Sequence, residues 1–269
     1  MINMIRLAAF ALGVFSIATA ALAETAKPAD AGKQTKRANF VACPLVRNTY
    51  VPCWLAQKDG ELYYLGPQGD LGAPFHPPQL KHRALVEGVV SDEPRICGGI
   101  VLKPVRVSVL PEIDESCNTI LPADGYPDPP HHRTPGPSNS EREERPRPAR
   151  DVADAPLAPR SFDVPFAFDV GQHLYSRDSQ IVSNAARHAA AAKASKVEII
   201  GYRGGALLSN GERLMEREDV GSLRAEMIRN MLLHAGVAQS TLQVRSMAAE
   251  EPDGIDDFQL RRATIVVTP

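Results

Sequence analysis

The chain has 269 residues, of which 43% are hydrophobic and 23% charged, and its formal net charge is −2. This length accommodates one large or two small domains. The near-neutral charge provides no basic surface for nucleic acid and no polybasic face for a membrane, so we expect neither partner. The 23 prolines exceed the roughly 5% of an ordinary globular chain, which indicates that one part of the chain does not fold.

The first 23 residues have the pattern of a secretory signal peptide. Arg6 supplies a short positive region, residues 7–22 are apolar or small, and residues 21–23 form a small-x-small cleavage site. The alternative is a membrane anchor, but a spanning helix needs about 20 apolar residues and this stretch has 16. We expect a periplasmic protein without direct membrane insertion, associated with the outer membrane only through a partner. Residues 24–37 are expected to be a flexible leader.

The four cysteines, Cys43, Cys53, Cys97 and Cys117, all lie in the first half of the chain. An even number of cysteines in an exported protein predicts two disulfides. Closeness in sequence favours Cys43–Cys53 and Cys97–Cys117, although the sequence leaves the other pairings open. The spacings contain no closely spaced pair of the kind that zinc sites use. We therefore expect structural disulfides and no metal site.

Residues 38–122 are predicted to form a small all-β domain. Turn signals occur at Lys58-Asp59-Gly60 and Gly98-Gly99, and no helical period is evident. The runs of β-forming residues between them are 48–51, 61–65, 84–90 and 100–110. Several short strands with two disulfides suggest a small closed barrel, either OB-like or SH3-like. The sequence of this domain indicates no ligand.

Residues 123–160 are predicted to be a linker, because they contain nine prolines in 38 positions and charges of both signs. Such a segment would tether two domains. His131 and His132 lie within it. A solvated histidine pair with no further ligand binds metal weakly, so no metal role is expected there.

Residues 161–269 are predicted to form a second domain of the α/β class. Its elements follow the order β-α-β-α-β-β, with strands at 162–168, 196–202, 242–245 and 263–267 and helices at 173–194 and 221–234. This order predicts an α/β sandwich in which two helices cover one face of a small mixed sheet.

Five short motifs occur in this second domain in a recognisable order. They are Phe166-Ala167-Phe168-Asp169, the strand Val197–Tyr202 ending in Gly-Tyr, Leu223-Arg224-Ala225, Ala235-Gly236-Val237, and Arg261-Arg262 before the last strand. With these motifs residues 162–267, about 40% of the chain, resemble the OmpA-like C-terminal domain family. The resemblance implies the fold just described and a non-covalent, non-enzymatic association with bacterial peptidoglycan.

The resemblance also implies a ligand site. In the family, an Asp after the Gly-Tyr and an Arg at the second helix bind the ammonium and the carboxylate of a diaminopimelate, as charge complementarity requires. Arg224 matches the Arg and is the candidate peptidoglycan-binding residue. The Asp position falls at Gly204, and the family's two Asn positions fall at Arg217 and Leu260. The partner for an ammonium group is therefore missing.

Other residues of the same region could compensate. Glu216, Glu218 or Asp219, in a loop about five residues longer than usual, could supply a substitute carboxylate. Arg262 is either a supporting ligand contact or an ion-pair partner at the sheet edge. The remaining arginines of the loop add positive charge, which solvated faces commonly carry.

Two functions stay open. In the first, the protein associates with peptidoglycan through Arg224. In the second, Arg224 is a surface residue paired with Glu216 or Glu226, and the protein is a periplasmic adaptor for an unknown envelope protein that has lost the diaminopimelate site. No nucleophile elbow, zinc-protease motif or phosphate-binding loop occurs. We therefore expect neither catalysis nor a cofactor.

Overall fold

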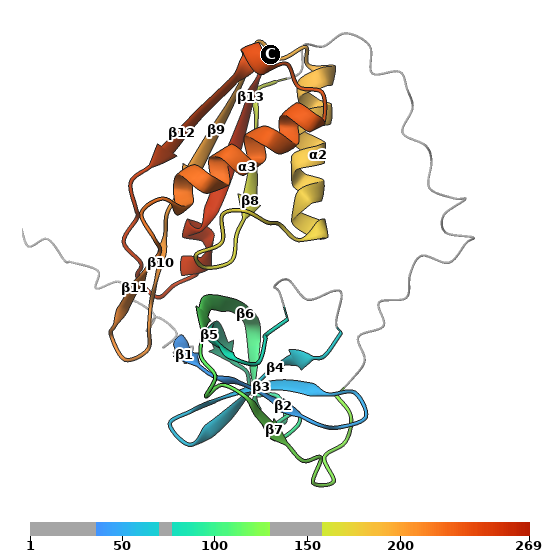
Figure 1. Cartoon of the computed structure of the whole chain (residues 1–269), viewed down its shortest axis with the longest axis vertical. Coiled ribbons are helices and arrows are strands. Elements are labelled where there is room, and N and C mark those ends of the chain that lie inside the picture. The colour runs from blue at the N-terminus through green and yellow to red at the C-terminus, as the bar shows by residue number, and fades with distance from the viewer. Residues whose placement is uncertain (1–35, 70–76, 130–157) are drawn as a thin grey trace, which may run out of the picture. The chain divides into compact units, whose positions relative to one another are not determined.

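A computed structural model describes residues 36–69, 77–129 and 158–269 (Figure 1). The expected signal peptide, nearly all of the leader, the middle of the linker and the pair His131-His132 lie outside the described residues. The described residues belong to one unit that runs from Thr35 to Pro269. We call residues 36–129 the N-terminal lobe and residues 158–269 the C-terminal lobe. No helix in the described ranges is long and apolar enough to cross a membrane.

The N-terminal lobe consists of strands. Their hydrogen-bonded order is β1-β5-β6-β4-β3-β2-β7. Neighbours are antiparallel except for β2 with β7 and β4 with β6. The bounds are β1 Phe40–Ala42, β2 Pro44–Arg47, β3 Cys53–Lys58, β4 Glu61–Pro67, β5 His82–Val90, β6 Ile100–Ile113 and β7 Thr119–Leu121. An all-β lobe is thus present, whereas its assignment as an OB-like or SH3-like barrel stays a prediction.

The local sequence explains the turn between β3 and β4. Asp59 and Gly60 both have positive φ, 50° and 80°, as a tight turn between twisted antiparallel strands requires. The strand expected at residues 48–51 is wrong, because these residues form bends between β2 and β3. The chain has to reverse there, since β2 and β3 pair antiparallel from Arg47↔Cys53 onward.

The favoured disulfide pairing is also wrong. The bonds are Cys43–Cys117, with Cα atoms 4.9 Å apart, and Cys53–Cys97, with Cα atoms 6.5 Å apart. Cys43 directly precedes β2 and Cys117 closely precedes β7, so the parallel pairing of these strands places the two cysteines together. Strand pairing between distant segments, rather than closeness in sequence, therefore determines the connectivity.

The C-terminal lobe is an α/β sandwich with the predicted order of helices and strands and one additional hairpin. A four-stranded mixed sheet, in the order β12-β9-β13-β8, has α2 and α3 against one face (Figure 1). The strands are β8 Arg160–Pro165, β9 Lys196–Tyr202, β12 Leu242–Met247 and β13 Arg262–Thr268; the helices are α2 Ser176–Ala191 and α3 Val220–His234. The added hairpin consists of β10 Gly205–Leu207 and β11 Arg213–Met215, and two short 3₁₀ turns lie at η1 Gln239–Thr241 and η2 Asp257–Leu260.

The core of this lobe positions the start of α3. Alternate residues of β9 and β13 are buried against the helices, among them Val197, Ile199 and Ile265, as the two-residue period of a strand dictates. At the end of β9 a Cβ atom on Gly201 would lie 1.8 Å from the carbonyl oxygen of Gly221. This close approach brings the first turns of α3 onto the end of β9, where Arg224 lies.

The two lobes share an apolar cluster. Leu85 of β5 packs with Phe168, Ala206 and Leu208 of the C-terminal lobe, and all four side chains are buried. The hydroxyl of Ser108 on β6 accepts a hydrogen bond of 3.0 Å from the backbone N–H of Phe168. Burial of such apolar surface is the main favourable term in association, so the lobes interact beyond their covalent connection.

Candidate functional site

Arg224 is fully buried near the start of α3, with an exposed fraction of 0%. Its Nε donates to the carbonyl oxygen of Val170 at 2.9 Å. The Nη atoms donate to the carbonyl oxygens of Tyr202 at 2.8 Å and Ala167 at 3.1 Å. The two remaining Nη hydrogens point to the carboxylate of Glu216, and the guanidinium also lies 5.1 Å from the ring centroid of Phe166. All five N–H donors of this guanidinium therefore have acceptors.

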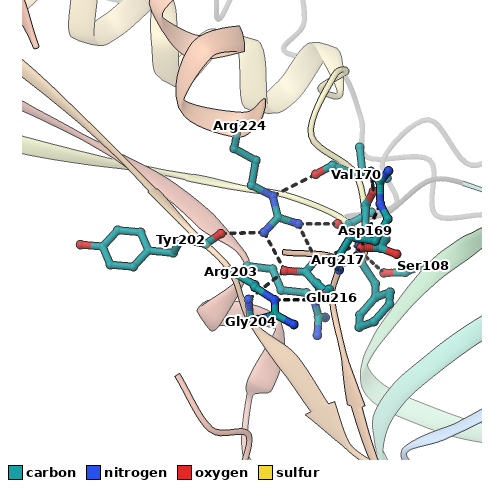
Figure 2. Close-up of polar contacts among 12 residues, drawn as sticks. Ser108, Asp169, Val170, Tyr202, Arg203, Gly204, Glu216, Arg217 and Arg224 are labelled. Atoms are coloured by element: carbon teal, nitrogen blue, oxygen red, sulfur yellow. Dashed lines mark hydrogen bonds and ion pairs between the residues drawn. The ribbon is translucent and has the colours of Figure 1, made fainter. Parts of the chain in front are cut away.

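Glu216 supplies the carboxylate at the centre of the site (Figure 2). Its Oε1 accepts from Arg224 Nη2 at 2.5 Å and from the backbone N–H of Asp169 at 2.8 Å. Its Oε2 accepts from Arg224 Nη1 at 2.8 Å and from the backbone N–H of Gly204 at 2.8 Å. Each carboxylate oxygen thus receives one guanidinium bond and one backbone bond, the two-pronged geometry that Arg–carboxylate pairs favour.

The backbone around Glu216 holds this arrangement. Glu216 directly follows β11, and its N–H donates to the carbonyl oxygen of Gly204 at 3.2 Å. The carbonyl oxygen of Glu216 accepts from Arg203 Nε at 2.6 Å, and the next residue, Arg217, donates its backbone N–H to Asp169 Oδ1 at 2.7 Å. The acidic residue and its loop are therefore fixed on both sides of the carboxylate.

These donors make a carboxylate receptor that the chain itself fills. A guanidinium and two converging backbone N–H groups complement a carboxylate in charge and geometry. In this conformation the receptor has no unused donor, because Arg224, the Asp169 N–H and the Gly204 N–H all bind Glu216. An external carboxylate can take this position only after Glu216 leaves it.

The structure brings together some of the residues that the sequence suggested. Arg224 pairs with Glu216, one of the partners considered for it, but the pair is buried and not on the surface. Asp219 is exposed, and its nearest described ionic contact is Arg217 at 4.0 Å. Arg262 stacks on Tyr202, at 4.2 Å from the ring centroid, and lies 3.7 Å from Glu250. None of the contacts described for Asp219 or Arg262 reaches the guanidinium of Arg224.

A second buried ion pair, between Arg261 and Glu87, is not among the contacts expected from the sequence. Arg261, 1% exposed, donates from Nη1 to Glu87 Oε1 at 3.2 Å and to the carbonyl oxygen of Gly205 at 2.9 Å, and its Nη2 contacts Glu87 Oε2. Glu87 lies on β5 of the N-terminal lobe and is 6% exposed. A glutamate inside the apolar run 84–90 indicates a buried ion pair, because charged residues are rarely buried without a partner.

A third group of ionisable residues lies at the start of α2. Burial raises the pKa values of Tyr175 and Asp178 and lowers the pKa of Arg106.

Among the residues that the structure describes, the group with metal-ligand spacing is Cys43, Asp114 and Cys117. Both cysteines of that group are in one disulfide and so offer no thiolate.

Comparison with solved structures identifies likenesses to the C-terminal lobe. The OmpA-like domain of FopA1 from Francisella tularensis subsp. tularensis SCHU S4 matches at 15% identity, covering 41% of this chain and 73% of that chain, with a TM-score of 0.33. The periplasmic domain of Helicobacter pylori MotB matches at 14% identity, with coverages of 41% and 76% and a TM-score of 0.33. The peptidoglycan-associated lipoprotein from Burkholderia pseudomallei matches at 22% identity, with coverages of 40% and 90% and a TM-score of 0.33.

The order of helices and strands expected from the sequence is present in the C-terminal lobe, with the hairpin β10–β11 added. The resemblance of this lobe to the OmpA-like family rests on its sequence motifs. No protein-family model matches the chain, and no curated protein gives a significant match. The likeness to the solved structures concerns the fold alone.

Proposed function

We propose that this chain is an exported, non-enzymatic protein of the bacterial envelope whose OmpA-like lobe acts as an adaptor for protein contacts while Glu216 fills its carboxylate site. The saturation of Arg224 supports this proposal most directly, because its five N–H donors are bonded and its side chain is 0% exposed. Export is supported by the signal-peptide pattern of residues 1–23 and by the pairing of all four cysteines in disulfides.

The free-energy cost of moving Glu216 out of the site favours an adaptor over a wall-binding protein. Separating a buried ion pair so that one partner stays uncompensated costs about 3–5 kcal/mol. An opening cost of about 4 kcal/mol weakens any external ligand roughly a thousandfold. A stem-peptide carboxylate would recover part of this cost only by remaking the same bonds with Arg224.

Peptidoglycan association is the second candidate. It is favoured by the completeness of the receptor, because the guanidinium of Arg224 and the N–H groups of Asp169 and Gly204 are the donors that a free carboxylate needs. Stem peptides of the cell wall carry such carboxylates. This function requires Glu216 to leave the receptor.

Co-sedimentation with insoluble peptidoglycan separates the two candidates. The full chain and the variants Glu216→Ala, Arg224→Ala and Glu218→Ala are compared, and circular dichroism verifies that each is folded. The proposal predicts that the unmodified chain and the Glu218→Ala control, altered at an exposed position two residues away, remain in the supernatant. If the unmodified chain pellets with peptidoglycan and Arg224→Ala does not, the adaptor proposal is contradicted and wall binding is supported.

A further inference from the structure

The hairpin β10–β11 connects the N-terminal lobe to the carboxylate of Glu216. Its strands pair in the register Gly205↔Met215 to Leu207↔Arg213, and Glu216 is the next residue of the chain. A two-stranded hairpin is marginally stable by itself in water. Its position therefore depends on what holds it from outside.

Asn39 of the N-terminal lobe holds the tip of the hairpin. The backbone N–H of Asn39 donates to Ser209 Oγ at 2.9 Å, and the Ser209 N–H donates to the Asn39 carbonyl oxygen at 2.7 Å. The Asn39 side-chain amide donates to the carbonyl oxygens of Leu207 at 3.3 Å and Gly254 at 3.1 Å. Asn39 is 5% exposed, and its bond to the Gly254 carbonyl oxygen is buried, where a hydrogen bond is stronger than in water.

The body of the hairpin contacts the N-terminal lobe directly, and its root is linked to that lobe through Arg261. Ala206 and Leu208 pack in the apolar cluster with Leu85 of β5. At the root, the carbonyl oxygen of Gly205 accepts from Arg261, whose counter-ion is Glu87 on the same strand β5. The N-terminal lobe thus contacts β10 directly at Ala206 and reaches its first residue, Gly205, through the Arg261–Glu87 ion pair. Gly205 is next to Gly204, whose N–H binds Glu216.

We propose that the N-terminal lobe regulates the Arg224 site, because its grip on the hairpin β10–β11 keeps Glu216 in the carboxylate receptor. When that grip is released, the hairpin moves, Glu216 withdraws and the receptor accepts an external carboxylate. This inference rests on the proposed closed site and adds the element that controls it. Coupling between two sites is reciprocal, so a carboxylate bound at Arg224 weakens the contact between the lobes.

Amide hydrogen exchange of the full chain tests this coupling. The variant Asn39→Asp keeps an acceptor for the Gly88 N–H but places one carboxylate oxygen, in place of the amide nitrogen, against the Leu207 and Gly254 carbonyl oxygens. The measured signals are the N–H groups of Asp169 and Gly204, the two backbone donors to Glu216. Local opening raises their exchange rates without global unfolding. We expect acceleration of at least about tenfold, which corresponds to 1.4 kcal/mol.

Two further variants make the test specific. Leu208→Ala weakens the apolar contact from the hairpin side and leaves the side chains of the N-terminal lobe intact, and it should accelerate the same two amides. Arg213→Ala changes an exposed side chain of β11 and should leave both amides protected.

Unchanged exchange at Asp169 and Gly204 in both Asn39→Asp and Leu208→Ala would overturn the coupling, as would equal acceleration across the whole core of the C-terminal lobe. Poor protection of these two amides in the unmodified chain would instead contradict the closed site itself. The two failures are therefore distinguishable.

Discussion

Replacing Glu216 by Gln measures how much the buried pair contributes to stability. The side-chain shape is retained while one charge is removed. Each oxygen of Glu216 accepts one bond from Arg224 and one from a backbone N–H. Whichever way the amide is turned, its NH₂ group therefore faces two donors and two hydrogen bonds are lost. The guanidinium also stays buried without a counter-ion, so we expect a loss of about 3–5 kcal/mol in the free energy of unfolding.

Urea unfolding provides the assay, with Glu218→Gln as the matched control. For a slope of about 2–3 kcal/mol/M the midpoint should fall by about 1–2.5 M. Glu218 is exposed, and its variant should stay within about 0.5 kcal/mol of the unmodified chain. A Glu216→Gln midpoint equal to that of the control would mean that the pair is solvated or not formed, which contradicts a buried ion pair.

Three further predictions concern other features of the chain. Gly204→Asp should destabilise the protein and give no gain in peptidoglycan sedimentation, because a Cβ there would lie 2.8 Å from the Cβ of Leu260; a stable variant with new wall binding would contradict this. Burial raises the pKa of Asp178, so the ionised form of this side chain opposes folding. The free energy of unfolding therefore decreases as pH rises through that pKa. Asp178→Asn should therefore raise the melting temperature at pH 7, and the difference should vanish below the ordinary value of 3.8; a pH-independent difference would count against it. Non-reducing peptide mapping should recover the disulfide pairs separated by 74 and 44 residues, and a bridge between sequence neighbours would show that the strand pairing is wrong.

Local pattern was sufficient to predict the C-terminal lobe. The strand expected at residues 196–202 is β9 with the same bounds, because a run of β-branched residues ending in Gly-Tyr is a short-range signal. The helix expected at residues 221–234 is α3, which begins one residue earlier. The hairpin β10–β11 was not anticipated, since its two strands have three residues each and too little period to detect.

Contacts between distant residues could not be predicted in the same way. Glu87 and Arg261 are 174 residues apart in sequence, and their pairing depends on how the two lobes pack. Glu216 was one of three acidic candidates, and only the register of the hairpin singles it out for Arg224. The parallel pairing of β2 with β7 likewise decided the disulfides. In each case the local sequence pattern does not indicate the contact, which forms only through the pairing of distant elements in the folded chain.

The proposed function depends on one feature of the site, the saturation of the Arg224 guanidinium by the chain's own carboxylate. The exchange rates of the Arg224 Nη–H groups, which bind Glu216, are followed by NMR in the full chain, with Arg213 as the exposed reference. We predict a resolved Arg224 signal that is protected from exchange and that does not shift when peptidoglycan fragments are added. The Glu216→Ala variant should make this signal exchange faster. A signal that exchanges as fast as that of Arg213, or that shifts when wall fragments are added, would contradict the closed site.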